Sequence, residues 1–214
     1  MPTHSFFWNC IANNYAKQPV ADEVSYQKKL DHTEQYLSSD TRVLEFGCGT
    51  GSTAIYHAPK VKHVHATDFS SKMLQIAKEK ADTANVTNIS FEQTQLLDLN
   101  SPNGSWDVVL GMSILHLLHD WQAHIAKVFE LLKPGGVFVT STACIGDMGT
   151  RFKLFAPLFK VLPFMPSVQI FSQKALKESM ENAGFTIEYE WCPGPNKAVF
   201  MVARKPEEHN ANVK

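Results

Sequence analysis

Three glycines and an acid near the start of the chain have the types and spacing of a ligand site. Gly47, Gly49 and Gly51 follow residues 43–46, which read as a strand, with the spacing G-x-G-x-G, and Asp68 ends a second strand-like stretch at 63–68. A turn from a strand into a helix uses glycine where φ is positive or where a ligand touches the backbone. A carboxylate at the end of the next strand can accept hydrogen bonds from both hydroxyls of a ribose. This order therefore predicts a site for an adenosine-type ligand.

The spacing of the glycines and an acid before them disfavour a dinucleotide. Dinucleotide sites have the spacing G-x-G-x-x-G, which leaves a helix N-terminus free for the pyrophosphate. Here Gly51 comes one residue early, and Glu45 places a carboxylate where a pyrophosphate would be repelled. An acid at that position suits a ligand with an ammonium group. Two structural alternatives stay open: glycine turns also occur without ligands, and Asp68 also stands where it would cap the helix that begins near Ser70 and Ser71.

Short apolar runs alternate with helical stretches around these residues. We expect five strands, at 42–46, 63–68, 89–93, 107–112 and 137–142, and helices at 20–37, 50–57, 71–81, 120–132 and 172–183. Apolar strands separated by helices indicate a parallel sheet that is covered on both faces. Strands at 185–191 and 197–204, joined by a short Pro- and Gly-containing connection, predict an antiparallel C-terminal hairpin. The fold class is therefore α/β, with a seven-stranded, mostly parallel sheet.

The composition excludes several classes of protein. The chain has 214 residues, of which 44% are hydrophobic and 19% are charged, so it can build a core. Its net charge of −1 gives no reason to expect a nucleic acid partner. We expect no signal peptide and no transmembrane segment. The separated cysteines, which resemble reduced cytosolic thiols, predict a cytoplasmic protein without a metal site; they are Cys10, Cys48, Cys144 and Cys192.

Several blocks of the chain resemble one enzyme family. They are residues 43–54, Asp68, residues 107–109 and the sequence Leu-Lys-Pro-Gly-Gly at 132–136. Together they resemble the class I S-adenosylmethionine-dependent methyltransferases, and most of all the small-molecule branch that includes the ubiquinone- and menaquinone-biosynthesis methyltransferases. The resemblance runs over residues 8–205. It implies a Rossmann-like fold, S-adenosyl-L-methionine as cofactor and S-adenosyl-L-homocysteine as product.

The resemblance also implies how the methionine and ribose parts of the cofactor are held. Glu45, with the backbone at Gly47 and Gly49, would hold the methionine moiety, and Asp68 would hold the ribose. The full set of expected cofactor-binding residues is Glu45, Gly47, Cys48, Gly49, Asp68, Phe69, Met73, Gln95, Leu96 and Met112.

The adenine end is less typical of the family. Phe69 and Met73 would line the adenine, and Met112 would face the cofactor near the methyl group that is transferred. Where the family has an acid that binds the adenine amino group, this chain has Gln95, followed by Leu96. A glutamine accepts the same hydrogen bond through its carbonyl oxygen.

A general base is harder to assign. His116 and His119 follow the fourth predicted strand, at the carboxyl edge where ligands lie in such sheets. A titratable imidazole there can act as a base, and we take His116 as the catalytic candidate. A histidine at this position is also common in the family across diverse substrates, which favours a structural or cofactor-side role.

The resemblance predicts one domain over residues 1–214. Its expected parts are an N-terminal helical cap (1–40), a cofactor-binding half (41–143), a Phe- and Pro-rich insertion on the substrate side (144–171), the last helix and strand pair (172–205) and a frayed tail (206–214). In the insertion, Phe152, Phe155 and Phe159 recur at helical spacing. Two interpretations of the insertion stay open: a helix that buries one face against the sheet, or a wall over an apolar substrate.

The predicted function is methyl transfer from S-adenosylmethionine to a small, partly apolar acceptor by in-line displacement. The alternative is a regulatory or non-catalytic protein that binds the same cofactor. A nicotinamide-dependent oxidoreductase is disfavoured by Glu45 and by the glycine spacing. The sequence leaves open which acceptor is used, whether an O, N, C or S atom is methylated, and the oligomeric state.

Overall fold

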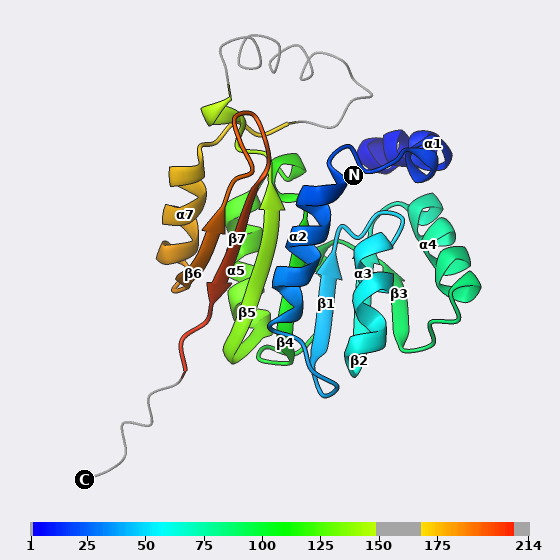
Figure 1. Cartoon of the computed structure of the whole chain (residues 1–214), viewed down its shortest axis with the longest axis horizontal. Helices are drawn as coiled ribbons and strands as arrows, with labels where there is room; N and C mark the ends of the chain where they lie inside the picture. Colours follow the sequence, from blue (N-terminus) through cyan, green and yellow to red (C-terminus); the bar gives the residue numbers. More distant parts are fainter. Residues whose placement is uncertain (1, 149–167, 208–214) are drawn as a thin grey trace.

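A computed structural model describes residues 2–148 and 168–207, arranged around one seven-stranded sheet (Figure 1). The strands are β1 (Arg42–Phe46), β2 (His63–Asp68), β3 (Ile89–Gln93), β4 (Trp106–Met112), β5 (Leu132–Thr142), β6 (Thr186–Trp191) and β7 (Val199–Arg204). Their order is β3-β2-β1-β4-β5-β7-β6. The first five strands are parallel, and β7 runs antiparallel between β5 and β6. The predicted α/β class, with its C-terminal antiparallel pair, is confirmed.

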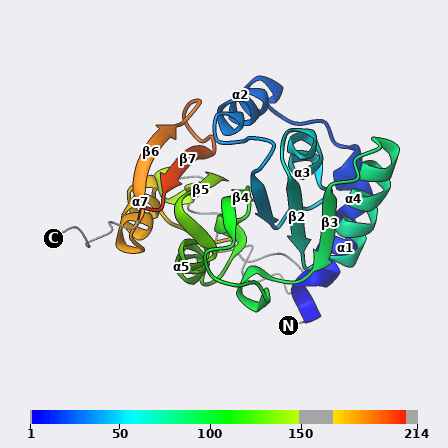
Figure 2. The ribbon, with the colours of Figure 1, turned by 90° about the horizontal axis from the view of Figure 1, so that it is seen from below.

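Helices cover both faces of the sheet. Figure 2 shows α2 and α3 on one face and α5 and α7 on the other. The helices are α1 (Pro2–Lys17), α2 (Glu23–Glu34), α3 (Ser52–His57), α4 (Ser71–Thr83), α5 (Trp121–Leu131) and α7 (Gln173–Asn182). Single 3-10 turns are η1 (Ala58–Lys60), η2 (Leu96–Asp98), η3 (Leu115–Leu117) and η4 (Ile145–Asp147).

The central strands are apolar on both sides because two separate cores enclose them. Successive side chains of a strand point to opposite faces. In β1, Val43 packs into a core that includes residues of α3 and α4, whereas Leu44 and Phe46 pack into the core that α5 and α7 complete. This explains why β1 has buried side chains on both of its faces rather than alternating buried and exposed positions.

The starts of two elements, α2 and β5, differ from the predicted starts by three residues or more. Helix α2 begins at Glu23 rather than at 20, because the Asp22 side chain accepts a hydrogen bond from the Ser25 backbone N–H at 3.1 Å and caps the helix. Strand β5 begins at Leu132, five residues before the predicted start at 137. Residues 132–136 are therefore not only a turn: the Gly135 N–H donates to the Lys205 carbonyl at 2.9 Å and keeps this stretch beside the end of β7.

Some predictions fall outside the described residues. Phe152, Phe155 and Phe159 belong to the range 149–167, and the last part of the tail belongs to 208–214; the structure describes neither. The division of the chain into five parts stays a prediction. Among the described residues, no helix is long and apolar enough to cross a membrane.

The N-terminal helix is tied to the start of α4. Asn9 in α1 accepts two hydrogen bonds through Oδ1, from the Ser70 hydroxyl at 2.7 Å and from the Lys72 backbone N–H at 3.1 Å. Ser70 is the N-cap of α4, and its Oγ also accepts a hydrogen bond from the Met73 N–H. Figure 1 shows α1 beside α4 at the carboxyl end of the sheet. One side chain therefore positions α1 next to the end of β2, where Asp68 lies.

Replacing this anchor should loosen α1 without unfolding the sheet. Asn9→Ala removes two hydrogen bonds, each worth about 0.5–1.5 kcal/mol, so we expect amide hydrogen exchange in α1 to accelerate about tenfold. The matched control is Asn13→Ala, on the exposed side of the same helix. Mass spectrometry of exchanged peptides measures the effect, and equal exchange in the two variants would contradict the anchoring role of Asn9.

Candidate functional site

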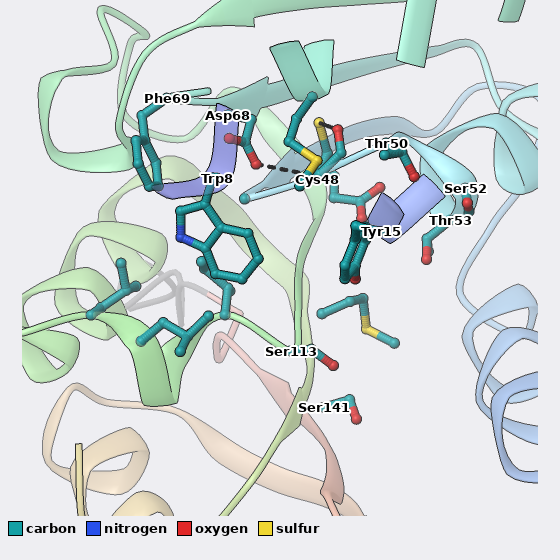
Figure 3. Close-up of a pocket in the computed structure, with 18 of the residues that line it drawn as sticks. Trp8, Tyr15, Cys48, Thr50, Ser52, Thr53, Asp68, Phe69, Ser113 and Ser141 are labelled. Carbon is teal, nitrogen blue, oxygen red and sulfur yellow. Dashed lines mark hydrogen bonds between the residues drawn. The ribbon is translucent and has the colours of Figure 1, made fainter. Parts of the chain in front are cut away.

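A cavity of about 1000 Å³ opens at the carboxyl ends of β1, β2, β4 and β5 (Figure 3). Ligands of parallel α/β sheets bind at this edge. Side chains from α1 and α2 close the cavity from the other side, and they include Trp8, Tyr15, Tyr26 and Lys29. Its volume is at the upper end of the range for sites of small molecules and cofactors, about 300–1,000 Å³.

Most of the predicted cofactor residues meet in this cavity. Those that line it are Glu45, Gly47, Cys48, Gly49, Asp68, Phe69, Met73, Gln95 and Met112. Leu96 does not line it: the residue is 3% exposed and packs into the core beneath α5. Its neighbour Leu97, which is 44% exposed, lines the cavity instead. The 3-10 turn η2 begins at Leu96 and sends these two adjacent side chains in different directions.

The carboxylate of Asp68 is held by the backbone on both of its oxygens. Oδ2 accepts a hydrogen bond from the Gly49 N–H at 2.9 Å, and Oδ1 accepts one from the Ser70 N–H at 2.8 Å. Each carboxylate oxygen has two acceptor positions, so each keeps one for a ligand hydroxyl. Burial raises the pKa of Asp68, and these backbone donors offset part of that shift. Asp68 therefore organises the turn and retains the capacity to bind a ribose.

Glu45 is the most strongly perturbed acid of the site. The residue is 2% exposed, and its Oε2 has no hydrogen-bond partner among the described residues. Burial, followed by the charge of Asp68, raises the pKa of Glu45 to about 8, against a smaller opposing effect of the Ala54 backbone N–H. Near pH 7 the carboxyl group therefore carries a proton when nothing is bound. An ammonium group beside Oε2 would satisfy this atom and favour the ionised form.

Two glycines of the turn have different surroundings, although both have positive φ. At Gly49, φ is +54°, and an added Cβ would have only the Tyr15 ring within 4 Å, at 4.0 Å. At Gly51, φ is +74°, and an added Cβ would lie 2.9 Å from the Cβ of Ala77 in α4. Gly49 therefore leaves the backbone open to the cavity, whereas Gly51 lets α4 pack closely against the turn.

The histidines near the fourth strand are not equivalent. His116 does not line the cavity, and its Nδ1 is buried without a partner among the described residues. Burial lowers the pKa of His116 to about 4, which makes it a weak base. His119 and His124 do line the cavity. The structure thus gives no support to His116 as the base, and this assignment stays a prediction.

His124 is a site residue that the sequence did not indicate. It lies in the first turn of α5, is 6% exposed, and its Nδ1–H donates to the Asp120 carbonyl at 2.9 Å. Because a carbonyl only accepts, the proton is on Nδ1 and the lone pair is on Nε2. Burial lowers the pKa of His124, so the imidazole is neutral near pH 7. The signal in the sequence was its place one turn after a helix start at the carboxyl edge.

Lys29 and Ser141 were also missed. The Lys29 Nζ donates a hydrogen bond to the Ser141 Oγ at 2.8 Å, and both residues line the cavity. Ser141 ends a predicted strand at the carboxyl edge, which is a detectable signal. Lys29 lies 112 residues away in α2, and no spacing in the sequence relates the two.

The two glycines offer a matched test. Ala at either position has the same left-handed strain of about 1–2 kcal/mol. Gly51→Ala adds overpacking against α4, typically about 1–3 kcal/mol, and should lower the free energy of unfolding more than Gly49→Ala does. Gly49→Ala should instead weaken S-adenosylhomocysteine binding at least tenfold. Urea unfolding and titration calorimetry measure the two effects, and equal stability losses would contradict the assignment.

The buried Glu45 should make the ligand-free protein less stable at high pH. Its pKa is raised from 4.5 to about 8, so its contribution to stability is complete below pH 4.5 and is lost as the pH rises through 8. Glu45→Gln removes the titration, and we expect its melting temperature to exceed that of the native protein by several degrees near pH 9 but not near pH 5. Glu181→Gln, at an exposed position of α7, is the control. An equal difference at both pH values would contradict the prediction.

Comparisons with known proteins identify the family. A family model described as a methyltransferase domain matches residues 43–136. The demethylmenaquinone methyltransferase of Listeria welshimeri is 32% identical over 172 residues, which cover 77% of this chain and 69% of that enzyme. The matched part spans 60% of the enzymes of that name from other Listeria strains. The enzyme of the same name from Thermus thermophilus is 29% identical over 169 residues, 70% of this chain and 76% of that enzyme.

The fold is shared with solved structures. The YcgJ protein of Bacillus subtilis superposes with a TM-score of 0.71 at 17% identity, over 85% of this chain and 99% of that one. At this identity the likeness concerns the fold alone. Together with the family model and the Listeria relative, the glycine turn, Glu45 and Asp68 lead to one conclusion. The chain belongs to the class I S-adenosylmethionine-dependent methyltransferases, with a resemblance to those of quinone biosynthesis.

Proposed function

We propose that this methyltransferase acts on a small acceptor with an apolar body, which binds beside the cofactor in the 1000 Å³ cavity. The observation that carries the proposal is the buried Glu45, which lines this cavity together with Asp68 and whose Oε2 has no hydrogen-bond partner among the described residues. An unsatisfied buried carboxyl group is costly. The burial of the Glu45 carboxyl group is explained if a cationic ligand forms a hydrogen-bonded ion pair with it.

S-adenosylmethionine supplies, when bound, an electrophilic methyl group on a sulfonium sulfur. In our proposal Glu45 binds the ammonium group of the methionine part, and the free acceptor positions of Asp68 bind the ribose hydroxyls. Phe69 and Met73 line the adenine, and Gln95 accepts a hydrogen bond from its amino group. The contribution of these residues is orientation, which is the main source of rate enhancement in such a transfer.

The acceptor would occupy the side of the cavity that follows β4. Its wall there is apolar, with Leu117 at the end of the turn η3 and with Ile114 and Leu118 directly before and after this turn. This wall excludes water and suits an apolar ring or chain. The names of the relatives point to demethylmenaquinone as their acceptor, and a compound of that apolar kind fits the same wall.

We propose His124 as the residue that receives a proton, at Nε2, when the acceptor loses one.

The remaining expectations concern partners and location. The formal charge of −1 and the four separated cysteines support a protein of the cytoplasm that does not act on nucleic acid. Both stay predictions.

Binding and turnover should be measured on the same protein. We expect titration calorimetry to show binding of S-adenosylhomocysteine, and Asp68→Asn to weaken it about 10–100-fold, the value for losing hydrogen bonds to a charged group. Asp98→Ala, at an exposed position outside the cavity, is the control. Release of S-adenosylhomocysteine in the presence of hydroxylated aromatic acceptors measures turnover. Absence of cofactor binding would refute the proposal, and binding without turnover on any acceptor would favour a non-catalytic role.

A further inference from the structure

A half-buried cation lies on the wall of the cavity opposite Asp68. Lys29 of α2 reaches the Ser141 hydroxyl at the end of β5, with 2.8 Å between Nζ and Oγ. Figure 3 shows Ser141 across the cavity from Asp68. The lysine and serine therefore give this cavity, whose other end is acidic, a basic end.

The ammonium group of Lys29 has no counter-ion within residues 2–148 and 168–207. Among the described residues, no carboxylate forms an ion pair with it, whereas Lys197, its cationic neighbour, is paired with Asp22 at 3.1 Å. Burial lowers the pKa of Lys29, and the more distant Asp22 compensates only in part. A partly desolvated charge without a partner is unfavourable unless a ligand supplies one.

At the basic end of the cavity, Lys29 has N–H donors left for a ligand, and the backbone beside Ser141 is held in place. An ammonium group has three N–H donors, and Ser141 uses one of those of Lys29, so two remain. The backbone of β5 is held in place here, because the Ser113 N–H donates to the Ser141 carbonyl at 2.7 Å. Ser113 adopts a positive φ of 56°, which is unusual for a residue other than glycine. Such strain is found where the surrounding structure holds a site in place.

This end of the cavity is separate from the cofactor residues. The sheet order β1-β4-β5 places Ser141 two strands away from Glu45, which is about 10 Å at the usual strand spacing. Met112 of β4, opposite Ser141 in the register, lies between them. Apart from Met112, the expected cofactor residues lie on β1, on β2 and on the segments that follow β1, β2 and β3, so Lys29 and Ser141 face the space that is left for the acceptor.

We propose that Lys29 and Ser141 form an anion subsite that binds an ionised oxygen, carboxylate or phenolate, of the methyl acceptor. The acceptor class is then an apolar ring with one anionic oxygen, because Ile114, Leu117 and Leu118 line the same cavity. An ammonium and a hydroxyl that converge on one oxygen make strong, charge-assisted hydrogen bonds. This inference rests on the proposed function, since it assumes that the cofactor occupies the β1 and β2 side.

The test uses small aromatic probes with the full-length protein saturated with S-adenosylhomocysteine. The carboxylate probe is 2-naphthoate, and its neutral counterpart is 2-naphthamide. The phenolate probe is 4-nitrophenol, ionised at about pH 8.5, with 4-nitroanisole as the neutral counterpart. We expect each anion to bind at least about tenfold more tightly than its neutral counterpart, and Lys29→Met to abolish this preference. The two anions distinguish a carboxylate site from a phenolate site.

Lys28→Met is the matched control. Lys28 is adjacent in α2, does not line the cavity and lies over the ring of Trp191 at 4.0 Å. We expect this variant to keep the anion preference of the native protein. No preference for either anion in the native protein, including no binding of any probe, would overturn the inference.

Cofactor affinity separates this inference from the proposed function. S-adenosylhomocysteine should bind Lys29→Met and the native protein with the same dissociation constant, within about twofold. A loss of at least tenfold in Lys29→Met would show that the lysine serves the carboxylate of the cofactor, which would overturn the acceptor subsite. Failure of the native protein to bind S-adenosylhomocysteine would instead refute the proposed function.

Discussion

The site depends on two carboxyl groups that are buried together. Glu45 on β1 and Asp68 at the end of β2 belong to adjacent parallel strands, and they are 2% and 7% exposed. The burial of Glu45, and after it the nearby charge of Asp68, raise the pKa of Glu45 to about 8. Such unfavourable pairs of buried acids occur at functional sites, where a bound ligand offsets the repulsion and the lost hydration. The pair is therefore the physical reason for a cationic, ribose-containing ligand at this position.

The surrounding elements make this pair possible. The turn between β1 and α3 brings the Gly49 N–H to Asp68, and the N-cap of α4 brings the Ser70 N–H. Asn9 binds the same N-cap from α1, so the helix that closes the cavity is connected to Asp68, the acid that we propose binds the ribose. Asn9, Ser70 and Asp68 thus form one short chain of hydrogen bonds from α1 to the end of β2.

The fold was predictable because each strand and helix is determined largely by the residues within its own segment. Strands such as β1 are apolar on both faces, and Ser172 caps α7 through its own side chain, so pattern alone indicates these elements. The glycine turn and Asp68 were predictable for the same reason. The sequence could not show that Leu97 rather than Leu96 lines the cavity, because the direction of a side chain in a 3-10 turn depends on how the turn packs, here against the core beneath α5.

Contacts between distant segments were not predictable. His124 faces the cavity because α5 packs with that side against the sheet edge, whereas His116 turns away within η3. The hydrogen bond between Lys29 and Ser141 depends on how α2 lies across the sheet. These residues belong to the acceptor end of the cavity, so sequence reasoning identified the methyl donor better than the acceptor.

The central claim is that Glu45 exchanges its proton for the ammonium group of the cofactor. The direct measurement is titration calorimetry of S-adenosylhomocysteine near pH 7 in buffers with different ionisation enthalpies. With a pKa of about 8 for Glu45 in the free protein, binding should release close to one proton, and Glu45→Gln should release none. Binding with no proton release, or with proton uptake, would contradict the account.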